Sequence, residues 1–224
     1  MSLTPTGLLH LRTWLPAELD ETFSVWCDDH HGEQLEVPGF LRVRRLSLVA
    51  SAATEPADYL TVYDLERLDV LESPEYAAYR ARGNTVPDAL KGQLRAARTD
   101  ASLVATAPAE GLGADGAGLA HLFVTDGPDL APWFAEGAQG LLDALAEPGA
   151  SSARLLSSDS GDQVVVVELT TEPADGDEAR ALLAGLPVPD GVDPGAGWGL
   201  YRLDHVNTPG GEARSPHRDR RDRS

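Results

Sequence analysis

The chain has 224 residues, enough for one large domain or two small ones, and its hydrophobic content (42%) and charged content (24%) are ordinary for a globular protein. A net charge of −18 argues against nucleic-acid binding, because an acidic surface repels phosphate backbones. The single cysteine, Cys27, excludes an internal disulfide, no apolar run approaches the roughly 20 residues that span a bilayer, and no signal peptide is evident, so we expect a cytoplasmic protein without a membrane segment.

The first hundred residues alternate between strand and helix patterns. Apolar residues at helical spacing predict a helix over 17–34, opened by a proline and ended by a Pro-Gly turn. A shorter helix is expected at 74–82, followed by a partly helical stretch at 87–98. Strands are expected at residues 8–15, 40–49, 59–65 and 101–106.

The second half repeats this order after a small-residue linker at 111–118. Strands are expected at 119–125, 153–157, 164–170 and 198–206, and helices at 130–146 and 177–186. The last residues, 209–224, combine a Pro-Gly-Gly turn with alternating charges and are expected to form a disordered tail.

The two halves also resemble each other residue by residue. Gly-Leu-Leu-His-Leu at 7–11 matches Gly-Leu-Ala-His-Leu at 118–122, and residues 58–65 match 162–169 at a slightly shorter offset. The copies differ where chemistry is concentrated, because Asp-Asp-His-His at 28–31 becomes Gln-Gly-Leu-Leu in the second copy, and Tyr63 becomes a valine. Function is therefore expected in the first copy.

The element order predicts an α+β fold. The order β-α-β-β-α-β, present twice, is that of the ferredoxin-like unit, in which both helices cover one face of a four-stranded antiparallel sheet. Two tandem units, at 1–110 and 118–208, would bury their other faces by pressing together or by curling into a barrel. We therefore expect two ferredoxin-like units packed as an intrachain dimeric α/β barrel.

Three segments carry a resemblance to a known group. The Trp-Cys-Asp-Asp-His-His run at 26–31, the Glu-Gln-Leu-Glu-Val-Pro-Gly-Phe run at 33–40 and the Tyr-Leu-Thr-Val-Tyr-Asp-Leu-Glu run at 59–66 resemble the EthD-like group of dimeric α/β-barrel proteins. The resemblance covers roughly residues 7–106. It implies a pocket between sheet and helices for a hydrophobic, often aromatic, small molecule, in a superfamily of cofactor-free monooxygenases, polyketide cyclases, haem-degrading enzymes and members without known activity.

A histidine at the end of the first helix is the expected proton-transfer group. His30 and His31 both qualify, since an imidazole titrates close to neutral pH. Alignment to the group's pattern favours His31, and a missing residue after it leaves the choice open. Asp28 or Asp29 would orient the imidazole or raise its basicity. The alternative is a solvated helix end with a histidine at the favourable end of the helix dipole.

Two further residues complete the expected catalytic set. Tyr63 would donate a hydrogen bond to a developing enolate or phenolate oxygen, and Arg44 would stabilise the same charge. A tyrosine at strand spacing is otherwise an ordinary half-buried core residue.

A second set is expected to bind substrate. Trp14 and Trp26 would form flat apolar walls, with Trp26 alternatively a core residue. Strand alternation places His10 with Arg12 and Trp14, opposite a leucine face, and the repeat gives His10 a counterpart in His121. No cluster has the spacing of metal ligands, so no metal and no cofactor are expected. Cys27 is expected to be a buried, inert thiol.

These observations favour a small-molecule enzyme of secondary metabolism, a cyclase or cofactor-independent oxygenase using acid/base chemistry on a polyketide-like or aromatic compound. Two alternatives stay open: a non-catalytic protein of the same fold that binds a hydrophobic ligand or an assembly partner, and a haem-handling enzyme. A tandem repeat could remain a monomer, as a pseudo-dimer, or pair again as a homodimer.

Overall fold

The computed structural model describes residues 5–83, 86–107, 116–147, 149–193 and 196–210. Most of the expected linker and nearly all of the expected tail lie outside these ranges, so both stay predictions. In the described ranges, none of the helices has the length and apolar character needed to cross a bilayer.

In the described part of the chain, eight strands and four α-helices follow one another as β-α-β-β-α-β, twice. A 3-10 helix precedes each of the first two α-helices, at Ala17–Leu19 and Leu68–Glu72. The first half contains β1 (Gly7–Trp14), α1 (Asp20–Gln34), β2 (Phe40–Ser51), β3 (Tyr59–Leu65), α2 (Pro74–Ala81) and β4 (Arg95–Ala107). The second half contains β5 (Gly118–Val124), α3 (Ala131–Ala144), β6 (Ala150–Ser157), β7 (Gln163–Leu169), α4 (Gly176–Ala184) and β8 (Gly199–Asn207).

One expected element is wrong in extent. The fourth strand begins at Arg95, six residues before the predicted 101–106 segment, and residues 88–93 form turns in place of the predicted helical stretch. The first residues of β4 are mostly Arg and Ala, two residue types with a high intrinsic helix propensity. Strand propensity depends strongly on packing and pairing with neighbours, so local preference gives way here.

The eight strands hydrogen-bond in the order β1-β3-β2-β8-β5-β7-β6-β4, which closes into a barrel. The pairs β1–β3, β4–β6, β5–β7, β5–β8 and β6–β7 are antiparallel. The predicted α+β class and the predicted barrel are therefore confirmed.

The chain divides into two compact units. Unit 1 contains the described residues within Met1–Arg45, Ala57–Asp100 and Asp204–Ser224, and unit 2 contains those within Leu46–Pro56 and Ala101–Leu203. The strands β2, β4 and β8 thus contribute residues to both units. The limits expected from the sequence, 1–110 and 118–208, stay predictions about the chain's organisation.

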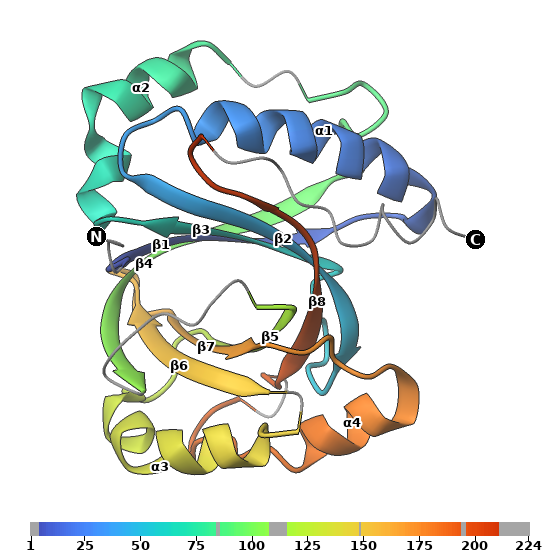
Figure 1. The fold of residues 1–224 in the computed structure, drawn as a ribbon, viewed down its shortest axis with the longest axis vertical. Helices are drawn as coiled ribbons and strands as arrows, with labels where there is room; N and C mark the ends of the chain where they lie inside the picture. The colour runs from blue at the N-terminus through green and yellow to red at the C-terminus, as the bar shows by residue number, and fades with distance from the viewer. Residues whose placement is uncertain (1–4, 84–85, 108–115, 148, 194–195, 211–224) are drawn as a thin grey trace. The chain divides into compact units, whose positions relative to one another are not determined.

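In unit 1, α1 and α2 lie on the same side of β1 and β3 (Figure 1). Alternate residues of these strands face the two helices, as period-two geometry requires. The main cluster of buried residues on this side consists of Leu9, Leu35, Val37, Phe40, Val43, Tyr63, Leu65 and Tyr76. A smaller cluster joins Phe23 and Cys27 of α1 to Leu90. Burial raises the pKa of the Cys27 thiol to about 12, so the thiol stays protonated, as expected for an inert core residue.

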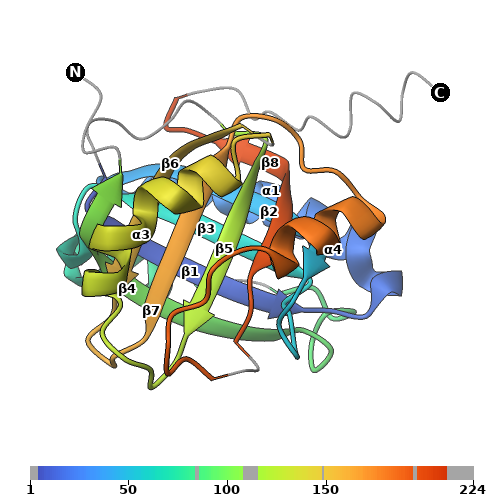
Figure 2. The ribbon, with the colours of Figure 1, turned by 90° about the horizontal axis from the view of Figure 1, so that it is seen from below.

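In unit 2, α3 and α4 likewise cover one face of β5 and β7 (Figure 2). Their core is more uniformly aliphatic, with Leu141 of α3 and Val165 and Val167 of β7 fully buried. Trp198 is also fully buried, and its indole N–H donates to the Pro187 carbonyl at 2.8 Å, which satisfies its one donor.

Strand register repeats between the halves. Gly7 lies opposite Leu65 in the β1–β3 pair, and Gly118 lies opposite Leu169 in the β5–β7 pair, which are the residues that the two sequence offsets match. The same correspondence extends along both pairs, since His10 lies opposite Val62 and His121 opposite Val166. The sequence match at 7–11 and 58–65 therefore has a structural counterpart.

A buried ion pair repeats as well. Arg44 of β2 lies 3.2 Å from Asp64 of β3, and Arg154 of β6 lies 2.9 Å from Glu168 of β7. All four side chains are about 1% exposed. The offset of 104 residues that relates β3 to β7 also relates Asp64 to Glu168, so a buried Arg–carboxylate pair occurs at matching positions in both halves.

Candidate functional site

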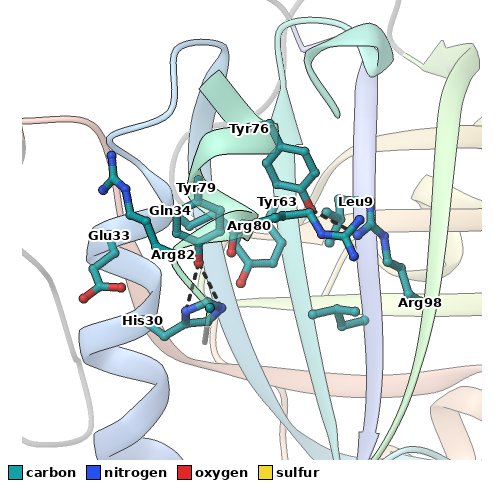
Figure 3. Close-up of a pocket in the computed structure, with 12 residues that line it drawn as sticks. Leu9, His30, Glu33, Gln34, Tyr63, Tyr76, Tyr79, Arg80, Arg82 and Arg98 are labelled. Carbon is teal, nitrogen blue, oxygen red and sulfur yellow. Dashed lines mark hydrogen bonds between the residues drawn. The ribbon is translucent and has the colours of Figure 1, made fainter. Parts of the chain in front are cut away.

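Unit 1 holds a cavity of about 340 Å³ between its sheet and its two helices (Figure 3). This volume lies in the range of small-molecule sites. Its wall combines aliphatic, phenolic and charged side chains from β1, β3, β4, α2 and the end of α1. The lining residues are Leu9, Leu11, His30, Glu33, Gln34, Tyr63, Tyr76, Tyr79, Arg80, Arg82, Gly83 and Arg98.

The sheet supplies the floor. Leu9 lies opposite Tyr63 across the β1–β3 pair, so both side chains point to the helix side, and Leu11 follows two residues later on the same face. Tyr63 is only 1% exposed, and burial raises the pKa of its phenol well above the ordinary value. The Tyr63 hydroxyl therefore stays protonated and can act only as a hydrogen-bond donor or acceptor.

His30 enters the cavity from the last turns of α1. Its ring stacks on Trp26 one helical turn earlier, at a centroid distance of 5.3 Å and an interplanar angle of 3°. A hydrogen bond of 2.9 Å joins His30 Nδ1 and the Tyr79 hydroxyl. Partial burial lowers the pKa of His30 below its ordinary 6.5, and the nearby Glu33 carboxylate opposes that shift. His30 is therefore neutral at pH 7.

The helix α2 presents two tyrosines to the cavity. Ser73 caps this helix by accepting a 3.1 Å hydrogen bond from the Tyr76 backbone N–H, and Pro74 occupies its first position. Spacing of three residues then puts Tyr76 and Tyr79 on one face, with their rings stacked at 6.1 Å. Burial raises the pKa of Tyr79 to about 12, so its phenol remains a donor at neutral pH.

Arg98 of β4 reaches the cavity on the side away from His30 (Figure 3). Its Nη1 donates to the Tyr76 hydroxyl at 3.0 Å, while its Nε and Nη2 donate to the two carboxylate oxygens of Asp100 at 2.7 and 2.8 Å. Hydrogen bonds with Asp100 raise the pKa of Arg98 against the opposing effect of burial. The guanidinium is thus held in one orientation by a bidentate carboxylate.

His31 lies behind the cavity and does not line it. The side chain is 1% exposed, and its ring meets Tyr63 edge-on at 5.6 Å. Burial lowers the pKa of His31 well below 6.5, and the Arg45 guanidinium lowers it further. Within the described residues, His31 Nδ1 has no hydrogen-bond partner. Of the two candidate histidines, the structure thus places His30 in the cavity wall, whereas His31 contacts Tyr63 without lining the cavity.

Asp28 does not line the cavity either. Its Oδ1 lies 2.7 Å from Arg45 Nη1 and 3.3 Å from His205 Nδ1. Arg45 also donates to the Ser24 carbonyl of α1 at 2.9 Å, so the contacts of Arg45 link α1 to β2.

Arg44 and Tyr63 are not brought together. Successive residues of β3 face opposite sides of the sheet, and Arg44 pairs with Asp64, the neighbour of Tyr63. Arg42 joins the same carboxylate at 2.7 Å. Arg44 therefore lies on the sheet face turned away from the cavity, and the expected cooperation of Arg44 with Tyr63 has no geometric basis.

The remaining expected residues also lie away from this cavity. His10, which is fully buried, alternates with the cavity-facing Leu9 and Leu11 and thus occupies the opposite face of β1. Arg12 lies 5.8 Å from the centre of the Trp14 ring on that face. His121 belongs to unit 2, where it meets Tyr201 edge-on at 6.0 Å. Trp26 contributes indirectly, as the plane on which His30 stacks.

Sequence reasoning missed Tyr76, Tyr79 and Arg98. A signal for the tyrosines was available, since two tyrosines three residues apart on a short helix share one face. Arg98 carried no such signal, because its segment was expected to be partly helical.

Unit 2 has its own cavity, of about 540 Å³, beside α4. Its lining is aliphatic with a few carboxylates and contains no histidine, tyrosine or arginine. The residues are Glu147, Thr171, Glu172, Ala174, Glu178, Ala179, Ala181, Leu182 and Leu200. In neither unit do three or more described His, Cys, Asp or Glu side chains converge as metal ligands would.

No protein-family model and no curated protein matches the chain. Solved structures with the same fold do match. A candidate monooxygenase from Fusobacterium nucleatum is similar over 94% of this chain and 98% of its own, with a TM-score of 0.51 and 10% identity. An anthrone oxidase-like protein is similar over 92% and 94%, with a TM-score of 0.52 and 15% identity. A candidate monooxygenase from Lactobacillus acidophilus is similar over 94% and 100%, with a TM-score of 0.50 and 12% identity.

Identities this low establish the fold alone. The chain has the ferredoxin-type barrel fold found in monooxygenase-like proteins, and each of these three chains spans nearly the whole of it.

Proposed function

We propose that the cavity of unit 1 is the active site of a small-molecule oxygenase that acts on a hydrophobic, aromatic compound by proton transfer. The observation that carries this proposal is the hydrogen-bonded pair of His30 and Tyr79 in a cavity of suitable size. The same fold in an anthrone oxidase-like protein supports the oxygenase assignment by analogy.

The pair of His30 and Tyr79 is a competent base. His30 is neutral at pH 7, because burial lowers its pKa. In either tautomer the pair can accept one proton from a bound molecule, directly at an imidazole nitrogen or through the Tyr79 oxygen. The imidazolium that results lies close to the Glu33 carboxylate, which favours the charged form. Trp26 supports the ring from behind.

An anthrone serves as the model substrate for the oxidation. His30 would remove a proton from the methylene carbon, which leaves an electron-rich enolate. That enolate reduces O₂, one oxygen atom becomes the new ketone of the anthraquinone, and the other leaves as water, so that anthrone and O₂ give anthraquinone and H₂O. Tyr63, neutral and buried on the cavity floor, would donate to the substrate oxygen.

We further propose that the chain arose by tandem duplication of an ancestor in the EthD-like group, and that only the first copy kept an active site. Two features support the duplication, the repeated strand register and the repeated buried ion pair. Under the same offsets, His30 corresponds to Leu141 and Tyr63 to Val167, both fully buried aliphatic residues. Neither can transfer a proton, so only the first half would be active.

The test uses the full chain with anthrone in air-saturated buffer. We expect O₂ uptake and anthraquinone absorbance to rise in equal amounts, and the His30→Gln variant to lose this activity while it keeps the wild-type melting temperature. Tautomerisation of anthrone to anthrol without O₂ uptake would show proton transfer at this base and would refute the oxygenase assignment. Saturable anthrone binding without conversion would favour a non-catalytic carrier, and full activity in His30→Gln would refute the assigned base.

A further inference from the structure

We propose that Arg98 and Tyr76 form an oxyanion-binding end of the unit 1 cavity, so that the site takes phenols and enols and holds them as their anions. This inference deepens the proposed function, because it names the substrate class of the same cavity. Neither residue is predicted from the sequence as a site residue. Asp100, which does not line the cavity, positions Arg98 through a bidentate contact.

The first support is the fixed orientation of Arg98. Asp100 takes the Nε and Nη2 donors in a bidentate contact at 2.7 and 2.8 Å, and Tyr76 takes one Nη1 donor at 3.0 Å. A guanidinium has five N–H groups in a rigid planar fork. Among the residues that the structure describes, none accepts from the other two N–H groups, which are therefore available to a ligand, and the fork is held in place by the first three.

The second support is the direction of the Tyr76 proton. A phenolic O–H lies in the plane of its ring, in one of two positions. Arg98 donates into one side of the Tyr76 oxygen, so the hydroxyl proton takes the other side and is available to an acceptor. The ring is 4% exposed and fixed by packing against Phe40, at a centroid distance of 5.6 Å. Tyr76 is therefore a polarised donor in a set direction.

The third support is the separation of the two polar ends. Figure 3 shows His30 hydrogen-bonded to Tyr79 at one side of the cavity and Arg98 hydrogen-bonded to Tyr76 at the other, with Tyr63 between them. A proton taken up at the first end leaves negative charge on the ligand, and the donors at the second end are placed to receive it.

The charge balance favours a phenolate or enolate over a carboxylate or phosphate. Asp100 already offsets much of the Arg98 charge. A compact, strongly hydrated anion would gain too little there to offset its dehydration. A phenolate spreads its charge over an aromatic ring, which can also pack against Tyr76 and Tyr79.

The probe is p-nitrophenol, a chromogenic phenol whose anion absorbs visible light, titrated into the full chain across a pH series. We expect saturable binding as the phenolate, seen as a lowered apparent pKa of the bound probe. Replacing the charge with Arg98→Gln should weaken phenolate binding about 10- to 100-fold. Arg95→Gln is the matched control, because Arg95 lies on the same strand, 3.9 Å from the centre of the Trp14 ring and away from the cavity.

Asp100→Asn loosens the guanidinium but also removes the carboxylate that offsets its charge, and these two effects oppose each other. It should therefore change phenolate binding less than Arg98→Gln does. If Arg98→Gln melts well below Arg95→Gln, then Tyr76→Phe, which keeps the packed ring, carries the test, with an expected loss of about tenfold.

The results separate this inference from the proposed function. Binding of p-nitrophenol as the neutral phenol, no binding, or equal affinities in Arg98→Gln and Arg95→Gln would overturn the oxyanion end even if anthrone is oxidised. Arg98-dependent phenolate binding in a chain that does not oxidise anthrone would support the oxyanion end and count against the oxygenase reaction.

Discussion

The cavity of unit 1 and the cavity of unit 2 each lie beside the second helix of their half, but their linings differ in kind. The first presents three tyrosines, a histidine and three arginines, whereas the second presents alanines and leucines with a few carboxylates. On the helices themselves, the buried Tyr76 of α2 contrasts with the buried Ala179 of α4. The strands and buried ion pairs beneath both helices keep the same plan.

This contrast separates what the fold needs from what the site needs. The register of β1–β3 and β5–β7 and the ion pairs at Asp64 and Glu168 are present in both halves, so they belong to the framework. A histidine and tyrosines line only the first of these two cavities. The framework is therefore expected to control stability, and the lining of the first cavity to control chemistry.

The largest expected effect is on turnover. His30→Gln should lower the rate of anthrone oxidation by about 10²- to 10⁴-fold, the usual contribution of a general base. Initial rates of O₂ uptake at saturating anthrone measure it. The exposed Glu21 at the start of the same helix provides the control, since Glu21→Gln should keep the wild-type rate. Equal rates for both variants would place the base elsewhere.

The next effect is on stability. Glu168→Gln removes the carboxylate opposite Arg154, and breaking one partner of a buried pair costs about 3–5 kcal/mol in the free energy of unfolding. Asp64→Asn should cost at least as much, because Asp64 serves both Arg42 and Arg44. Urea unfolding measures both losses.

The exposed pair of Arg180 and Asp177 gives the comparison for these variants. Asp177→Asn should leave the unfolding midpoint unchanged, because solvent screens an exposed pair. A shift for Glu168→Gln no larger than that for Asp177→Asn would mean that the buried pairs are not part of the framework.

A smaller effect concerns pH and His31. The folded state holds this imidazole neutral, since burial lowers its pKa well below 6.5, while in the unfolded chain it titrates near 6.5. The unfolded chain therefore binds the proton first as the pH falls. The free energy of unfolding should be flat above neutral pH and decline below about pH 6.5, by up to about 1.4 kcal/mol per pH unit.

The variant His31→Phe should flatten this decline, because a phenylalanine keeps the edge contact with Tyr63 and does not titrate. His30→Phe should flatten it less, since His30 is only partly buried. The measurement is the urea unfolding midpoint at a series of pH values between 5 and 8. Parallel plots of midpoint against pH for wild type and His31→Phe would show that His31 does not contribute to the pH dependence of stability.

Sequence patterns were sufficient for the framework and insufficient for the site. Period-two alternation predicted β1 and β3. It also placed His10 and Leu9 on opposite faces of β1, as they are in the structure. The same alternation puts Tyr63 and the next residue, Asp64, on opposite faces of β3. Asp64 is the ion-pair partner of the buried Arg44, so Arg44 does not share a face with Tyr63.

Arg98 could not be predicted as a site residue from the sequence, for a different reason. Residues 95–100 contain helix-favouring Arg and Ala, and they become a strand only through packing and pairing with distant segments. A side chain's face cannot be assigned before its element is known. The hydrogen bond between His30 and Tyr79 likewise joins α1 to α2, and no local pattern encodes such a contact.

The smallest expected effect is a null result in the second cavity. Leu11→Phe adds bulk to the first cavity and should lower kcat/KM for anthrone by about tenfold, because an overfilled pocket costs about 1–3 kcal/mol. Ala181→Phe adds comparable bulk to the second cavity, at an exposed helix position, and should leave kcat/KM unchanged. If Ala181→Phe lowers kcat/KM as far as Leu11→Phe does, the second cavity takes part in substrate binding, and the division between an active and a structural half is wrong.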